Sequence, residues 1–307
     1  MSSIVNIFKA SKEALGNKLS KLTPIKPALK GTILVIMGIL LTRYDLGVGF
    51  LTINTLFGMF SYFLIAVSGL ILIRNIRWKK DQNREILNPR RDILFFLILF
   101  LLGFNLLLVY CFLYYFNFII LIFTAFIGIF WVLIWFNAEK ERENSYVLNI
   151  FNSLIFALGL FFGALLNTYL TPLYIYYFFI SILFLQLARE ITKDLVRDVG
   201  TIEAQFKVKS AKELKKSMLR QDDLLGSKSK MIFLFGLISL VFILLPLIST
   251  IANPIMYLYP LAFIIILIAA ILYLSFKGYK ENTFYPRINS LLKYAILLEI
   301  VGFLFAS

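Results

Sequence analysis

The chain has 307 residues, of which 60% are hydrophobic and 17% aromatic, and its mean hydropathy is +0.86. Soluble globular domains are much less apolar, so this composition predicts an integral membrane protein. The net charge is +14, and the chain contains one cysteine and no histidine. A disulfide framework is therefore excluded, as are zinc or haem sites built from His or Cys ligands.

Residues 1–30 are basic and amphipathic, and they contain the stretch "KASKEALGNKLSKLTPIKPALK". This stretch lacks an apolar core followed by a small-residue cleavage site, so it is not expected to be a secretory signal. Basic amphipathic segments favour the surface of an anionic membrane. We therefore predict that residues 1–30 lie on the cytoplasmic face of the membrane and that residues 31–307 form a single membrane domain.

Nine apolar runs follow, each close to the roughly 20 residues that a helix needs to cross the hydrocarbon core. The runs are continuous, whereas a membrane barrel would alternate apolar and polar positions. Arg43 and Asp45 interrupt the first run, so residues 43–50 could form a turn. The sequence thus predicts an all-α bundle of nine transmembrane helices. The predicted spans are 31–50, 52–73, 93–115, 117–136, 147–167, 170–187, 231–251, 255–276 and 291–306.

The distribution of positive charge predicts the orientation of these helices. If the N-terminus is cytoplasmic and the chain crosses nine times, all of the 31 Lys and Arg residues except Arg43 fall on the cytoplasmic side or at its boundary. This distribution follows the positive-inside rule and places the C-terminus outside. The basic excess then reflects topology and contact with anionic lipid, and a nucleic-acid partner has little support. We predict a multi-pass protein of the cell membrane.

Two long charged segments lie between the apolar runs, at 74–92 after the second span and at 188–230 after the sixth. Their matching places divide the helices into two sets of four and a final helix, which suggests an internal duplication. Both segments carry carboxylates four residues apart, a spacing that puts them on one face of a helix. The same charges could serve topology alone, because cytoplasmic loops are commonly charged and such spacings are common on solvated helices.

The carboxylates are Asp81 and Glu85 in the first segment and Glu190, Asp194 and Asp198 in the second. Carboxylates at this spacing repel one another, and a cation between them would relieve the repulsion. Mg²⁺ in particular binds through one or two carboxylates, with water and substrate phosphates completing its shell. Basic side chains nearby are suited to phosphate oxygens. They are Arg77, Lys80, Arg84, Lys193 and Arg197.

At these positions the sequence resembles the UbiA superfamily of intramembrane prenyltransferases. That family has nine transmembrane helices, an N-x-x-x-D-x-x-x-D element after the second helix and a D-x-x-x-D element after the sixth. The second element is intact here as "KDLVRD", with Asp194 and Asp198. The overlapping "REITKD" resembles the R-E-x-x-K-D lead-in of the branch that prenylates glyceryl phosphate ethers.

The first element of the family is altered in this sequence. Asp81 matches its first aspartate, Glu85 replaces the second, and Arg77 stands in the place of the asparagine. "LNPRR" at 87–91 is similar to the family's N-x-P-x-R tail with one residue missing. Lys140 matches a lysine of the family's segment after the fourth helix.

The resemblance implies a bundle around a central cavity that opens to the cytoplasmic side. It implies that Mg²⁺ binds the diphosphate of a polyprenyl donor and that the prenyl group passes to a lipophilic acceptor, either a glyceryl ether phosphate or an aromatic quinone precursor. The implied metal ligands are Asp81, Glu85, Asp194 and Asp198. The implied catalytic residues are Asp194, Asp198 and Lys193. The implied substrate-binding residues are Arg77, Lys80, Arg84, Lys140, Glu190 and Arg197.

Two other functions stay open. A non-catalytic protein with the same fold is one, because Arg77 could neutralise the acidic face that a metal requires, or could bind a diphosphate directly. A small-solute transporter is the other, since ionisable residues inside a membrane often mark an ion path. The candidates for such a path are Glu299 in the last span and the pair of Arg43 and Asp45.

Overall fold

The computed structural model describes residues 25–46, 53–80, 89–113, 117–140, 145–168, 171–206, 211–248, 254–278 and 284–306. Within these ranges the chain folds into nine α-helices of 22 to 34 residues and one short 3-10 turn, and it contains no strand. The predicted all-helical fold is confirmed. The helices are α2 (Ile25–Leu46), α3 (Ile53–Lys80), α4 (Pro89–Leu113), α5 (Phe118–Lys140), α6 (Ser145–Asn167), α7 (Leu173–Phe206), α8 (Ala211–Leu244), α9 (Pro254–Gly278) and α10 (Tyr285–Ala306).

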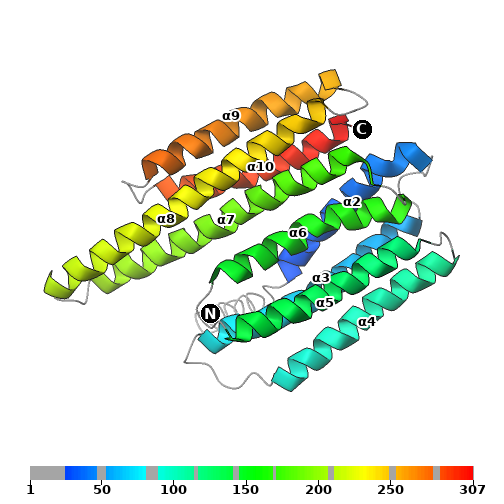
Figure 1. The fold of residues 1–307 in the computed structure, drawn as a ribbon, viewed down its shortest axis with the longest axis horizontal. Helices are drawn as coiled ribbons and strands as arrows, with labels where there is room; N and C mark the ends of the chain where they lie inside the picture. The colour runs from blue at the N-terminus through cyan, green and yellow to red at the C-terminus, as the bar shows by residue number, and fades with distance from the viewer. Residues whose placement is uncertain are drawn as a thin grey trace, which may run out of the picture.

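Each helix overlaps one predicted span, but α7 and α8 extend far beyond theirs and project from one end of the bundle (Figure 1). The charged segment that follows the sixth span is therefore helical over most of its length. Residues 188–230 contain no proline, and Lys, Arg, Glu and Gln are good helix formers, so this segment favours helix although it is charged. The apolar pattern marks where the membrane part of a helix ends, and the helix itself continues.

Seven of the described helices, α3 to α9, are long and apolar enough to cross a membrane. α2 contributes a shorter apolar segment, Pro27–Thr42. α10 carries Arg287, Lys293 and Glu299 along its length. A multi-pass membrane protein is thus supported, whereas nine crossings, the orientation of the termini and the central cavity stay predictions. The first 24 residues lie outside the described ranges, and α2 begins at Ile25, inside the segment expected on the membrane surface.

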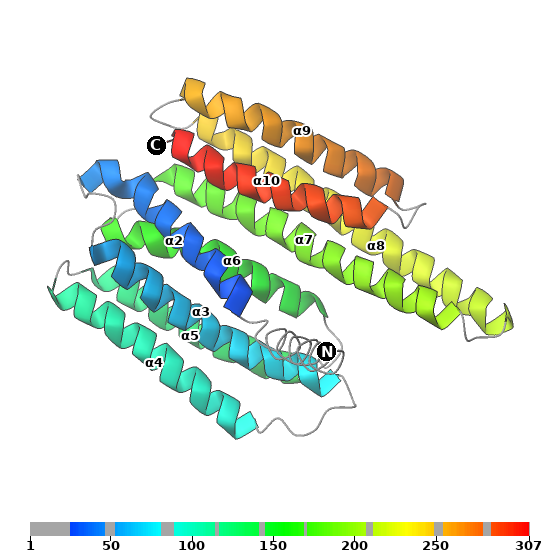
Figure 2. The same cartoon turned by 180° about the vertical axis from the view of Figure 1, so that it is seen from behind.

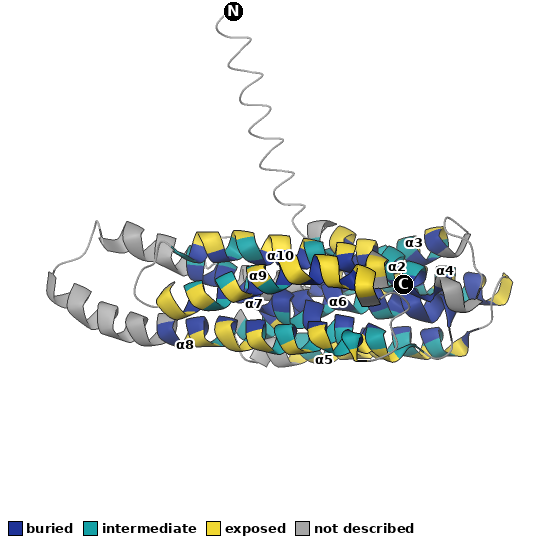
Figure 3. Cartoon of the chain, turned by 90° about the horizontal axis from the view of Figure 1, so that it is seen from above, coloured by how far each residue is buried: buried dark blue, intermediate teal, exposed yellow. Residues whose placement is uncertain are grey.

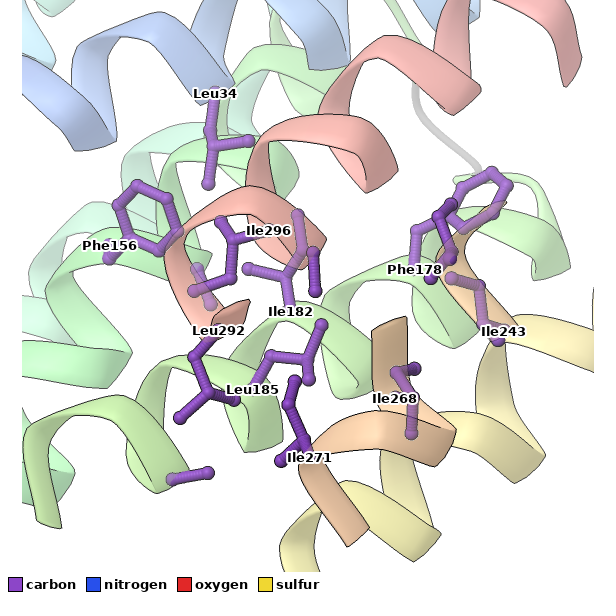
Figure 4. Packing of buried hydrophobic residues seen from close by; sticks show 14 of the residues in the cluster. Leu34, Phe156, Phe178, Ile182, Leu185, Ile243, Ile268, Ile271, Leu292 and Ile296 are labelled. Carbon is purple, nitrogen blue, oxygen red and sulfur yellow. The ribbon is translucent and has the colours of Figure 1, made fainter. Parts of the chain in front are cut away.

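The helices run side by side with alternating directions, in two groups that meet along α2 and α6 (Figures 1 and 2). One apolar cluster contains residues of α2 to α6, and a second joins α7 to α10 with further residues of α2 and α6. Figure 4 shows part of the second cluster, where Leu34 of α2 and Phe156 of α6 pack close to Ile296 of α10. Because α2 and α6 belong to both clusters, they join the two groups.

Three of the spanning helices lie inside the bundle. In α3, α6 and α7, 61% of the span residues are buried, whereas the share is 22–33% in α4, α5, α8 and α9. The exposed residues of the outer helices are mostly large and apolar, such as Phe126 and Ile255. Figure 3 shows exposed positions in yellow along the outer helices. In a membrane protein such a surface faces lipid. The second predicted acidic element therefore belongs to an inner helix, α7, whereas Asp81 and Glu85 of the first lie outside the described residues.

Glycines allow α2 and α6 to pack backbone to backbone. A Cβ atom at Gly159 would lie 2.2 Å from the carbonyl oxygen of Gly31, and one at Gly38 would lie 2.2 Å from that of Leu160. Real Cβ atoms do not approach so closely, so these positions require glycine, as in other close helix crossings in membranes. The crossing fixes α6 against α2 and thereby positions the first turns of α6 beside α7.

Candidate functional site

A buried carboxylate of α7 is held by a side chain of α6. Asn149 Nδ2 donates a hydrogen bond of 2.7 Å to Asp194 Oδ2. Asn149 is 2% exposed and Asp194 is 5% exposed. A charged group at such depth needs a partner, because moving a carboxylate out of water is costly. The intact acidic element predicted from the sequence is therefore an interior feature of the bundle at Asp194.

A second polar group lies on the same face of α7, one turn earlier. Glu190 Oε1 accepts a hydrogen bond of 2.9 Å from Gln186 Nε2 and also pairs with the ammonium group of Lys193. Glu190 and Gln186 are both buried, whereas Lys193 is partly exposed. Residues 186, 190, 193 and 194 share one stripe of the helix because they are three or four residues apart. The stripe brings together two of the predicted carboxylates, Glu190 and Asp194, and the predicted Lys193.

Three buried polar atoms at this stripe have no hydrogen-bond partner within the described ranges. They are Asn149 Oδ1, Gln186 Oε1 and Arg189 Nε. Buried polar atoms in folded proteins are nearly always paired with protein groups, water or ligand. Three unpaired atoms close to two carboxylates are typical of a site that is completed by solvent, an ion or a substrate.

Cations from three helices gather around the stripe. The charge of Lys30 in α2 interacts with those of Arg189 and Lys193 in α7, Lys293 in α10 and Glu190. These four cations face Glu190 and the neighbouring Asp194, so positive charge outnumbers the two carboxylates of the stripe. α2 and α10 also pack against one another, which explains how residues 263 positions apart in sequence act on one place.

For the other predicted site residues the structure gives at most the position of the backbone. Arg77 and Lys80 lie in the last turn of α3, and Lys140 is the last residue of α5. Arg197 and Asp198 follow Asp194 in α7. Asp81, Arg84 and Glu85 fall between α3 and α4, outside the described residues. Consecutive helices are antiparallel, so the ends of α3, α5 and α7 lie at the same end of the bundle as the start of α6. Whether the two acidic elements converge stays a prediction.

The described residues fit one side of the predicted Mg²⁺ site. No group of three or more His, Cys, Asp or Glu side chains gathers in the described part of the chain. Asp194, however, is a buried carboxylate beside an unpaired amide oxygen, Asn149 Oδ1. Hard divalent ions prefer oxygen ligands, which are carboxylates, amide carbonyls and water molecules. The remaining predicted ligands are Asp81, Glu85 and Asp198.

Sequence patterns did not reveal Asn149, Gln186, Lys30 or Lys293. Polar residues in apolar runs gave a weak signal, because "NIFNS" interrupts the fifth span at residues 149–153. Lys30 stands at the edge of the basic N-terminal segment, where one lysine among many carries no distinguishing signal. Arg189 begins the "REITKD" motif, but its proximity to the other cations depends on the fold.

No family model and no curated protein sequence matches the chain. A solved structure of a digeranylgeranylglyceryl phosphate synthase does match in three dimensions, with a TM-score of 0.60 over 92% of this chain and 94% of that one. The chain has the fold of the UbiA prenyltransferases. The two sequences are 17% identical, so the likeness is one of fold.

The UbiA-type fold extends over the whole bundle, because the match covers nearly all of both chains. The resemblance inferred from "KDLVRD" and "REITKD" is therefore confirmed at the level of the fold. In this UbiA-type bundle Asp194 of the intact acidic element lies on an inner helix and points into protein, as its burial and its contact with Asn149 show.

Proposed function

We propose that the protein is an intramembrane prenyltransferase that moves a polyprenyl group from a prenyl diphosphate to a lipophilic acceptor and requires Mg²⁺. The observation that carries this proposal is the buried, amide-held Asp194 in the acidic element of a UbiA-type bundle. A carboxylate kept for topology alone would be expected on a solvated surface, whereas Asp194 lies inside the protein.

The predicted site residues would have separate roles in binding the metal and the diphosphate. Asp194, Asp198, Asp81 and Glu85 would hold the metal, which when bound stabilises the departing diphosphate. Basic side chains in the last turn of α3, between α3 and α4, at the end of α5 and in α7 would bind the phosphate oxygens. They are Arg77, Lys80, Arg84, Lys140 and Arg197. The apolar interior would exclude water from the allylic cation that remains after the carbon–oxygen bond breaks.

The roles of Lys193 and Glu190 are coupled. Their ion pair, supported by Gln186, gives Lys193 a defined position beside Asp194. A positioned ammonium group there would neutralise charge that develops on the leaving diphosphate. Glu190 would act through Lys193, so its contribution to substrate binding would be indirect.

An anionic acceptor is favoured over a neutral one. Lys30, Arg189 and Lys293 contribute positive charge from three helices, and together with Lys193 they outnumber the two carboxylates of the stripe, Glu190 and Asp194. Excess positive charge favours binding of an anion. Since other basic residues are proposed for the diphosphate, we propose that Lys30, Arg189 and Lys293 serve the phosphate of a glyceryl ether phosphate. An aromatic quinone precursor is the other candidate.

The test uses purified protein in lipid nanodiscs. Calorimetry should show that a polyprenyl diphosphate binds in the presence of Mg²⁺ and fails to bind after chelation. With a glyceryl ether phosphate added, a labelled prenyl chain should appear in the lipid extract. Equal binding with and without chelator, together with absence of transfer to any acceptor, would favour a non-catalytic protein that binds diphosphate through its basic residues.

A further inference from the structure

Asn149 occupies an unusual position for an asparagine in a membrane helix. It lies in the second turn of α6, is 2% exposed, and directs its side chain toward α7. Its own backbone carbonyl accepts a hydrogen bond of 2.7 Å from Ser153 Oγ, which belongs to the same helix. The amide side chain is therefore the part of Asn149 that reaches a neighbouring helix.

The contact with Asp194 determines how the amide is oriented. Nδ2 can donate to a carboxylate, whereas Oδ1 can only accept, and a carboxylate is an acceptor as well. The reversed orientation would bring two acceptors together in the protein interior. The 2.7 Å contact from Nδ2 to Asp194 Oδ2 is thus the arrangement that the chemistry requires. It directs the other end of the amide, Oδ1, away from the bonded carboxylate oxygen.

Oδ1 is buried and has no hydrogen-bond partner within the described residues. A buried acceptor without a partner destabilises the fold, so a side chain used only for packing would be better replaced by an apolar one. The unpaired oxygen lies beside a carboxylate that the proposed function assigns to a hydrated divalent ion. Water in the shell of such an ion is a hydrogen-bond donor, which is the partner that Oδ1 lacks.

We propose that Asn149 is a positioning residue for the metal-binding carboxylate Asp194: its Nδ2 fixes the orientation of the carboxylate, and its Oδ1 provides a neutral acceptor for the hydrated ion. The proposal rests on the proposed function, because it requires that Asp194 binds a divalent ion. Residues that orient metal ligands in this way typically contribute 10- to 100-fold to metal affinity.

The chain offers a matched control for this residue. Ser153 is on the same helix, is fully buried, and makes its hydrogen bond to Asn149 through the backbone carbonyl only. Ser153→Ala removes a buried hydrogen bond from the same turn of α6 and leaves the amide of Asn149 in place. Asn149→Leu keeps roughly the volume of the side chain but lacks the amide. Asn149→Ala lacks both the amide and the volume, so an effect shared by the two variants reports the loss of the amide.

The experiment measures the affinity for Mg²⁺ in nanodiscs, without substrate, from the shift in melting temperature as the ion is added and from calorimetry. The melting temperature without metal reports folding separately. Asn149→Ala and Asn149→Leu should bind Mg²⁺ about 10- to 100-fold more weakly than the unmodified protein. Ser153→Ala should bind it equally well. In the transfer assay, raised Mg²⁺ should restore much of the activity of the Asn149 variants.

Asp194→Asn is the reference that separates the inference from the function on which it rests. If Asp194→Asn loses Mg²⁺ binding while both Asn149 variants bind as tightly as the unmodified protein, the role of Asn149 is refuted and the proposed function stands. If the unmodified protein binds no Mg²⁺, either alone or together with a polyprenyl diphosphate, both are refuted. An Asn149 variant with a lowered melting temperature and unchanged Mg²⁺ affinity also overturns the inference, because it shows a role in packing alone.

Discussion

Gly163 of α6 lies directly against the backbone of Val35 in α2, so that a Cβ atom at Gly163 would stand 2.1 Å from the carbonyl oxygen of Val35. Gly159, one turn earlier in α6, meets Gly31 of α2 in the same way. Two glycines four residues apart thus form a groove for the α2 backbone. Since α2 and α6 join the two groups of helices, this crossing holds the interior of the bundle in register.

Gly163→Ala should therefore destabilise the protein. The added methyl group meets backbone, which cannot move aside as a flexible side chain can, and overpacking of this kind costs about 1–3 kcal/mol. Gly302→Ala is the control, because a Cβ there would find its nearest neighbour, Pro260 Cβ, at 3.5 Å. Thermal unfolding in detergent should show a lower midpoint for Gly163→Ala and little change for Gly302→Ala. Equal midpoints would mean that the close crossing contributes nothing to stability.

Asp194→Asn should abolish prenyl transfer. Asparagine keeps the size of Asp194 and its place beside Asn149, but it lacks the charge that would hold the metal. Loss of a metal contact that strengthens as the diphosphate leaves costs several kcal/mol of barrier, which is about a thousandfold or more in rate. Glu85→Asp restores the usual residue of the family and keeps the charge, so its activity should be equal or higher. Incorporation of labelled prenyl chain measures both. A fully active Asp194→Asn would leave the acidic element with a topological role alone.

The sequence predicted the helices well because each apolar run is a local signal. The lengths of α7 and α8 were harder to predict from the sequence, because the charged residues 188–230 show no apolar periodicity that marks the end of a helix. Helix propensity and the spacing of Glu190 and Asp194 indicate a helix there, but only weakly. The structure adds the boundary itself, with α7 ending at Phe206.

The partners of the site residues could not be predicted in the same way. Asp194 was a clear candidate from "KDLVRD", but its partner Asn149 comes from another helix, 45 residues earlier. No periodicity within one helix encodes which neighbour it will face. The proximity of Lys30 and Lys293 was still harder to predict, because it depends on how the first described helix packs against the last.

Removing the charge of Lys30 or Lys293 should weaken binding of a phosphorylated acceptor. In Lys30→Met and Lys293→Met, the KM for a glyceryl ether phosphate should rise by roughly tenfold, which corresponds to one lost charge-assisted contact. The KM for the prenyl diphosphate should change much less. Lys277→Met is the control, because Lys277 is an exposed cation of α9 whose ammonium lies 6.0 Å from the ring centre of Tyr273. Equal effects on both substrates would remove the evidence for a separate place for the acceptor's anion.

Glu299→Gln should leave prenyl transfer unchanged. Glu299 is 1% exposed in α10, and neither of its carboxylate oxygens has a hydrogen-bond partner in the described part of the chain, although Ser181 and Tyr257 lie near it. These neighbours belong to α7 and α9, well away from Asp194 along α7. The amide has nearly the same shape and carries no charge, so the bundle should accept it. Strong loss of activity in Glu299→Gln, or an ion flux in proteoliposomes that the substitution abolishes, would favour the transporter interpretation.

The N-terminus should be cytoplasmic and the C-terminus outside, because this orientation alone places nearly all of the 31 basic residues on the inner side. A cysteine introduced at Val208, between α7 and α8 and outside the described residues, should react with a membrane-impermeant maleimide only after the cells are opened. A cysteine at Ile248 should react from outside, since this residue is 86% exposed at the opposite end of α8. The native Cys111 is 1% exposed and should give little background. Labelling of Val208→Cys in intact cells would place both acidic elements on the outer face. The proposed cytoplasmic opening of the site would then be wrong.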